Sequence, residues 1–148
     1  MKTSHLTAIL SLMLGLLATS ACRKEKPGEP AATEVHVKGT PHTDEVLAAW
    51  RNAGLAPEEF APMNPMIEKA TYCEHGKVNY VDTTVCEFES DQALDLGVQA
   101  VRKEWERIDA HTGVVVRAKR TLLAVVDRER REPSGKTISQ IINIFSTL

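Results

Sequence analysis

Three side chains in the middle of the chain, Cys73, His75 and Cys86, could support thiol or metal chemistry. The midpoint between the two cysteines falls between Asn79 and Tyr80, and asparagine tolerates the positive φ that a tight turn needs. A hairpin that turned at these two residues would place the thiols directly opposite each other. We therefore predict a Cys73–Cys86 disulfide, which would stabilise the domain by about 3 kcal/mol in the loop-entropy account.

Two alternatives to this disulfide stay open. A turn at Gly76 would leave the thiols apart, and the cysteines could instead bind a metal ion together with His75. The cysteines lack the close spacing of structural zinc ligands, however. The histidines His36, His42, His75 and His111 are scattered, with no pair four residues apart. We expect no metal site and no other cofactor.

One segment imitates a nucleotide-binding motif. Ser134-Gly135-Lys136-Thr137 ends like a Walker A loop, but the upstream glycine that such a loop needs falls at position 130, which is arginine. The segment is therefore typical of a helix start. The chain also lacks Gly-x-Ser-x-Gly and every other local nucleophile signature, so we predict no catalytic residue.

The charged residues favour solvation over nucleic-acid binding. The chain has 18 Lys and Arg against 20 Asp and Glu, a formal net charge of −2, and the run from Asp127 to Glu132 alternates in sign. In a second interpretation, six basic side chains form a lip that contacts an anionic envelope polymer or an acidic patch of a partner. These are Arg117, Lys119, Arg120, Arg128, Arg130 and Arg131.

The N-terminal residues indicate export. A basic start at Lys2 leads into an apolar stretch from Leu6 to Ala18, which is too short and wrongly flanked for a membrane-spanning helix. The tetrapeptide Thr19-Ser20-Ala21-Cys22 follows at once. Residues 1–21 are therefore expected to be a cleaved signal peptide.

This tetrapeptide resembles the lipobox of bacterial lipoproteins, in which an aliphatic residue, a small residue and Gly or Ala precede a lipid-accepting cysteine. Thr19 departs from the Leu that is usual in the family. The resemblance implies that Cys22 carries a diacylglycerol and an amide-linked acyl chain, which together anchor the protein in the membrane. It also implies the outer membrane, because Arg23 replaces the Asp that favours inner-membrane retention. The alternative is an ordinary secretory signal, cleaved after Ala21.

Three regions follow from these patterns. Residues 22–42 contain three prolines and almost no large apolar side chain, so we predict a lipidated cysteine on a flexible tether. Residues 43–148 are long enough for one small domain with a single core. No resemblance to a known family covers this domain.

Within the domain, apolar spacing and turn residues predict three helices and two hairpins. The segment 56–66 contains three prolines, which permit a short helical turn at 58–60 and an irregular connection. The expected helices are 43–53, 91–109 and a last one from about 134, with Thr137 and Gln140 spaced as a capping box; the hairpins are 70–89 and 114–126.

The predicted fold is therefore α+β, with a four-stranded, mainly antiparallel sheet and helices packed on one face. We expect a binding or structural interaction module in the cell envelope, facing the periplasm or the cell surface. Its partners would be the membrane, through the lipid, and an envelope protein or polymer. The alternative is a small periplasmic enzyme or enzyme inhibitor with a cleft near residues 56–66. A pocket with two or more titratable residues would favour the enzyme, and a flat apolar sheet face would favour the binder.

Overall fold

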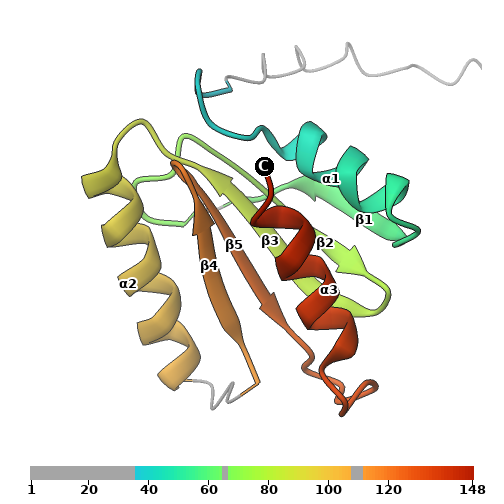
Figure 1. Cartoon of the computed structure of the whole chain (residues 1–148). Helices are drawn as coiled ribbons and strands as arrows, with labels where there is room; N and C mark the ends of the chain where they lie inside the picture. Colours follow the sequence, from blue (N-terminus) through green and yellow to red (C-terminus); the bar gives the residue numbers. More distant parts are fainter. Residues whose placement is uncertain (1–35, 65–66, 108–111) are drawn as a thin grey trace, which may run out of the picture. The chain divides into compact units, whose positions relative to one another are not determined.

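The computed structural model describes residues 36–64, 67–107 and 112–148, which form an α+β fold with a five-stranded antiparallel sheet and three helices (Figure 1). The sheet order is β1-β2-β3-β5-β4. The predicted signal peptide, Cys22 and the tether up to residue 35 lie outside the described residues. No helix within the described ranges combines the length and apolarity that a bilayer span requires. The elements are α1 (Thr43–Asn52), β1 (Pro57–Pro62), β2 (Tyr72–Val78), β3 (Val81–Glu87), α2 (Asp91–Arg107), β4 (Val114–Ala118), β5 (Thr121–Val126) and α3 (Lys136–Phe145).

Both predicted hairpins are present. Strands β2 and β3 turn at Asn79 and Tyr80, which have φ angles of 46° and 73°, as a two-residue turn between twisted strands requires. Cys73 therefore pairs with Cys86 across the ladder, and the two residues form the predicted disulfide, with their Cα atoms 4.1 Å apart. The prediction of the disulfide is confirmed.

The prediction of four strands was wrong, because residues 57–62 form a fifth strand, β1, in place of the expected helical turn. β1 pairs with β2 at the edge of the sheet, and its register shifts between Glu58 and Ala61. Glu59 takes a φ of 57° at this bulge. Proline is tolerated at a sheet edge, where its missing N–H removes no ladder bond. The prolines therefore limited this segment to an edge without excluding a strand.

The helices cover both faces of the sheet, so the prediction of a single covered face was also wrong. Successive residues of β5 point to opposite faces. Leu123 and Val125 pack with α1 and α3, while Leu122 and Ala124 pack with α2. All six residues of β5 are buried. Such a continuous apolar run is typical of a strand covered on both sides.

Each face has its own apolar core. Trp50 of α1 and Phe145 of α3 are fully buried on one face, and the indole N–H of Trp50 donates to the carbonyl oxygen of Ile141 at 3.1 Å. On the other face, Leu94 of α2 packs near Phe88 and the disulfide. The sheet thus supplies both cores from alternate residues of the same strands.

The start of α3 differs from the predicted capping box. Gly135 precedes the helix in the left-handed conformation, with a φ of 67°. The carboxylate of Glu132 accepts a hydrogen bond from the Thr137 N–H at 2.8 Å, while the Ser134 hydroxyl accepts one from the Lys136 N–H at 3.3 Å. Thr137 is thus a residue of the first helical turn, and the segment that imitates a Walker A loop already has a carboxylate at one of its N–H groups.

The folded domain begins before Thr43. Residues 36–42, which the sequence analysis placed in the tether, lie against the start of β5 and the end of β3. Val37 and Thr40 are only 8% and 6% exposed. These residues belong to the folded domain because they make polar contacts with residues far along the chain. Composition alone does not reveal such contacts.

Candidate functional site

A groove with a volume of about 860 Å³ lies on the α2 face of the sheet. Its floor is one row of paired residues across four strands, Ala61, His75, Thr84 and Ala124. Because neighbouring strands pair residue to residue, these four side chains share one face. Small-molecule and peptide sites commonly have volumes of about 300 to 1,000 Å³.

The walls of the groove are largely apolar. Helix α2 supplies Val101 and Trp105 on one side, while Met63 and Ile67 lie on the other, directly after β1. The cleft expected near residues 56–66 thus lies beside this segment. Val126, the last residue of β5, also lines the groove.

Two glycines let the α2 wall approach the sheet. A Cβ at Gly97 would lie 2.5 Å from the ring of Phe88, and a Cβ at Gly113 would lie 2.5 Å from the ring of Trp105. Both aromatic rings therefore pack directly on glycine backbone, and the Trp105 ring is held against the chain where it lines the groove.

Charged side chains stand at the rim, and two of the carboxylates are paired. Asp82 lies 3.6 Å from the guanidinium of Arg128. Glu104 accepts a hydrogen bond from Arg107 Nε at 2.9 Å, and this guanidinium holds the pKa of Glu104 below its usual range. The pKa of Arg107 is raised by the same contact. The contact with Arg107 thus favours the charged form of Glu104.

One pair in the floor could do chemistry. The Nδ1 atom of His75 lies 2.9 Å from the hydroxyl oxygen of Thr84, which is hydrogen-bond distance. A histidine in this position is able to take a proton from a hydroxyl group. Within the described residues, no cluster of three or more His, Cys, Asp or Glu side chains could hold a metal ion.

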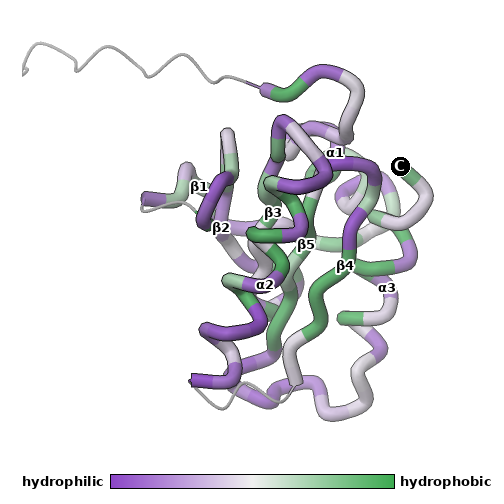
Figure 2. Tube along the Cα trace, turned by 90° about the vertical axis from the view of Figure 1, so that its left-hand side faces the viewer, coloured by the Kyte–Doolittle hydropathy of each residue, from purple (hydrophilic) through white to green (hydrophobic). Residues whose placement is uncertain are grey.

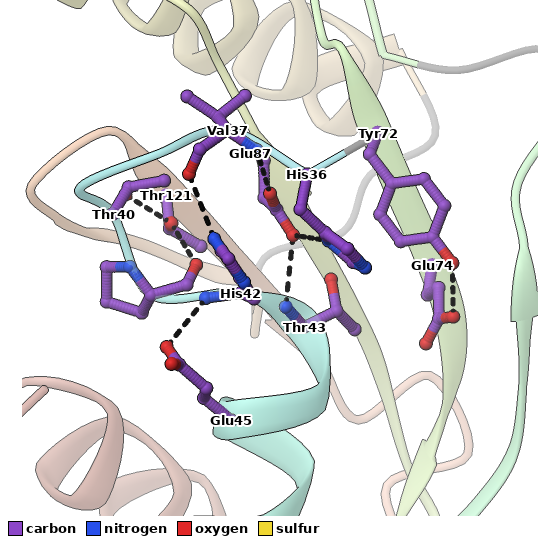
Figure 3. A network of polar contacts seen from close by, with 11 residues as sticks. His36, Val37, Thr40, His42, Thr43, Glu45, Tyr72, Glu74, Glu87 and Thr121 are labelled. Atoms are coloured by element: carbon purple, nitrogen blue, oxygen red, sulfur yellow. Dashed lines mark hydrogen bonds and ion pairs between the residues drawn. The ribbon is translucent and has the colours of Figure 1, made fainter. Parts of the chain in front are cut away.

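A second polar cluster surrounds the buried carboxylate of Glu87 (Figure 3). Its Oε1 atom lies 2.8 Å from Nδ1 of His36 and accepts the Thr43 N–H at 3.1 Å, while Oε2 accepts the Val37 N–H at 2.9 Å. The side chain of Glu87 is fully buried. A buried carboxylate requires such donors, so Glu87 fixes the 36–42 segment to the end of β3.

Further bonds hold the same segment against the β4–β5 turn. The hydroxyls of Thr40 and Thr121 lie 2.6 Å apart, and the Thr121 hydroxyl also donates to the carbonyl oxygen of Pro41 (Figure 3). The guanidinium of Arg120 donates to the carbonyl oxygens of Lys38 and Glu89. This cluster therefore positions backbone and leaves little room for a ligand.

The structure does not bring the six predicted basic contact residues together. Arg117, Lys119 and Arg120 lie at one end of β5 and Arg128, Arg130 and Arg131 at the other. A six-residue strand spans roughly 20 Å, so they form two separate groups.

Most of these basic side chains already have partners within the domain. Arg117 pairs with Asp95 at 2.7 Å, and Lys119 donates to the carbonyl oxygen of Leu148. Arg131 pairs with Glu129 and also lies over the ring of Tyr80. Of the six, Arg128 alone lines the groove.

Sequence reasoning expected a cleft near residues 56–66 but did not identify the row of residues that forms the floor of the groove, and it missed the Glu87 cluster. The disulfide gave the register of β2 and β3, and hence the His75–Thr84 pair, but nothing indicated that β1 would extend this row. For Glu87 the signal was an acidic residue at a strand end, on the same side of the strand as Val81 and Val85.

No protein-family model matches this chain, and neither a curated protein nor a solved structure matches it. The functional conclusion therefore depends on the residues and the geometry of this chain.

Proposed function

We propose that this chain is a lipid-anchored protein of the cell envelope, attached through Cys22, whose folded domain binds an envelope partner in the groove. The lipobox-like residues 19–22 support the anchor. The Cys73–Cys86 disulfide supports export, because such bonds persist mainly in oxidising compartments. Arg23 favours the outer membrane, with the domain facing the periplasm or the cell surface.

The groove is the observation that carries the binding proposal. Its walls are mainly apolar, and charges stand at its rim in pairs, Asp82 with Arg128 and Glu104 with Arg107. An apolar surface framed by paired charges suits an apolar side chain or short segment of a partner, with the rim fixing its orientation. We propose an envelope protein as the partner, with Arg128 contacting an acidic group beside the apolar segment.

The alternative is a small periplasmic enzyme or an enzyme inhibitor, and the His75–Thr84 pair favours the enzyme. In that function Thr84 would be the nucleophile and His75 its general base. The groove does contain several titratable side chains, but Asp82 and Glu104 are paired with arginines and not with His75 or Thr84. The binding function is therefore supported better.

The anchor is tested by the intact mass of the protein from its native membrane fraction. We expect a chain that begins at Cys22 with added acyl mass, and a gain of about two daltons on reduction as the disulfide takes up two hydrogens. An unmodified chain in the soluble fraction would overturn the lipid anchor.

The groove is tested in cells with a photoreactive amino acid placed at Thr84. The matched control places the same amino acid at Asp44, which is exposed on α1 at the opposite face. We expect a discrete cross-linked envelope protein from position 84 and none from position 44. Equal products from both positions, or none from either, would contradict binding in the groove. Loss of cross-linking in Arg128→Glu would identify the proposed rim contact.

A further inference from the structure

The two edges of the sheet differ in how they are protected against pairing with another strand. β1 begins and ends with proline, contains Glu58 and Glu59, and is bulged between Glu58 and Ala61. Prolines, charges and bulges are the devices with which proteins block edge pairing. The β1 edge is therefore protected against pairing with another strand.

β4, at the other edge, has neither a proline nor a bulge, and its one charged residue is Arg117. Its five residues are Val-Val-Val-Arg-Ala, with regular pairing to β5 throughout. Val114 is 37% exposed, and Val115 and Val116 are half-buried. Figure 2 shows this strand as an apolar stretch between α2 and α3. A flat apolar edge of this kind is a template for another strand.

The outward-facing backbone groups of β4 follow from the register. A two-residue turn at Lys119 and Arg120 makes Ala118 and Thr121 a hydrogen-bonded pair, and such pairs alternate along an antiparallel ladder. The N–H and C=O groups of Val115 and Arg117 therefore point away from β5. The same alternation, continued across β5 to its other neighbour β3, predicts that the N–H of Phe88 points toward β5. This N–H does donate to the carbonyl oxygen of Arg120.

The surface beside this edge is complementary to itself. A hollow of about 290 Å³ lies between α2 and β4, lined by Asp95, Val98 and Arg102 from the helix and by Val115, Val116 and Arg117 from the strand. Asp95 and Arg102 are seven residues apart, so they share one helix face about two turns from each other. Asp95 already pairs with Arg117 of its own copy at 2.7 Å. A two-fold axis reverses this face and would place the Arg102 of the other copy beside this Asp95, as a second cation on the same carboxylate.

We propose that two copies of this chain pair through antiparallel β4 strands around a two-fold axis near Val116. The sheet then continues across both copies, and the outward backbone groups of Val115 and Arg117 bind each other in the ladder. The exposed Val114 side chain loses contact with water on the opposite face. Asp95 and Arg102 of the two α2 helices form two symmetric ion pairs.

The test measures the mass of the purified full chain by analytical ultracentrifugation over a range of protein concentrations, in one detergent throughout. We expect twice the protomer mass for the wild type. For Val115→Pro we expect the mass of a single protomer. Proline at this position removes an N–H that faces outward and leaves the hydrogen bonds between β4 and β5 intact. An unchanged circular dichroism spectrum would show that this variant is folded.

A second variant keeps the test independent of the folding of the proline variant. Arg102→Glu places an acid opposite Asp95 and should weaken the dimer roughly tenfold, because the symmetric interface contains the contact twice. Lys103→Glu makes the same charge change on the neighbouring exposed residue and should leave the dimer unchanged. A wild-type protomer at every concentration would overturn the proposal, as would a dimer that neither variant weakens. If the chain is monomeric and another protein slows hydrogen exchange at the Val115 amide, the edge binds a strand of that protein. This result would also overturn self-pairing.

Discussion

Glu87 and His36 are 51 positions apart in the chain, yet Oε1 of the buried carboxylate lies 2.8 Å from Nδ1 of the imidazole. This contact joins the end of β3 to the segment that leads toward the proposed anchor. Two backbone N–H groups, from Val37 and Thr43, complete the coordination of the carboxylate. Glu87 thus supplies three of the contacts that hold the N-terminal segment against the domain.

Replacing Glu87 should therefore loosen this segment first. Glu87→Ala removes the acceptor of three donors, and we expect a loss of roughly 2–4 kcal/mol in the free energy of unfolding, measured with chemical denaturant. Hydrogen exchange at Val37 and Thr43 should accelerate more than exchange in β5. Glu89→Ala, at an exposed position two residues on, is the control and should change stability little. Equal effects of the two substitutions would show that Glu87 does not hold the segment.

The disulfide should contribute measurably to stability. Cys73 and Cys86 are separated by 13 positions. In the loop-entropy account, a disulfide that closes a loop of this length stabilises the fold by about 3 kcal/mol, because it restricts the unfolded chain. We expect Cys73→Ala with Cys86→Ala to lower the free energy of unfolding by about this amount. Reduction of the wild type should have a similar effect, while reduction of the double variant should have none. A double variant as stable as the oxidised wild type would contradict this prediction.

Gly97 should be intolerant of even one added methyl group. A Cβ there would lie 2.5 Å from Cζ of Phe88, which is fully buried under α2. We expect Gly97→Ala to destabilise the domain by about 1–3 kcal/mol in thermal or chemical unfolding, although alanine favours helix. Gln99→Ala, exposed on the same helix, should be neutral or slightly stabilising. Stabilisation by Gly97→Ala would show that α2 can move away from the sheet at little cost.

Glu104, at the rim of the groove, should remain charged in mild acid. Because Arg107 lowers the pKa of Glu104, this carboxylate stays ionised to a lower pH than an isolated glutamate. A lowered pKa in the folded state stabilises the fold above the unfolded pKa, and that contribution is lost as the pH falls through the folded pKa. Arg107→Gln should raise the pKa of Glu104 toward its ordinary value, observed by NMR titration of the side chain. Both groups are exposed, so we expect little change in unfolding; an unmoved pKa would contradict the pairing.

Local patterns in the sequence were sufficient for most of the elements. The apolar spacing from Leu94 to Trp105 predicted α2, whose start at Asp91 is the predicted one. The equal distance of Cys73 and Cys86 from Asn79 and Tyr80 predicted the turn, the register and the disulfide together. These features depend on residues close in the chain, where spacing and backbone preference act directly.

The tertiary structure decided which surfaces meet. Whether 57–62 would be a strand depended on an open edge of β2, and the side of the sheet that α2 covers depended on packing at Gly97 and Phe88. Glu87 became an anchor for residues 36–42 only once β3 brought it to them. The groove and the exposed β4 edge arise in the same way, from elements that are distant in the chain. Contacts of this kind depend on how buried surfaces and polar partners match in three dimensions, which residue spacing does not specify.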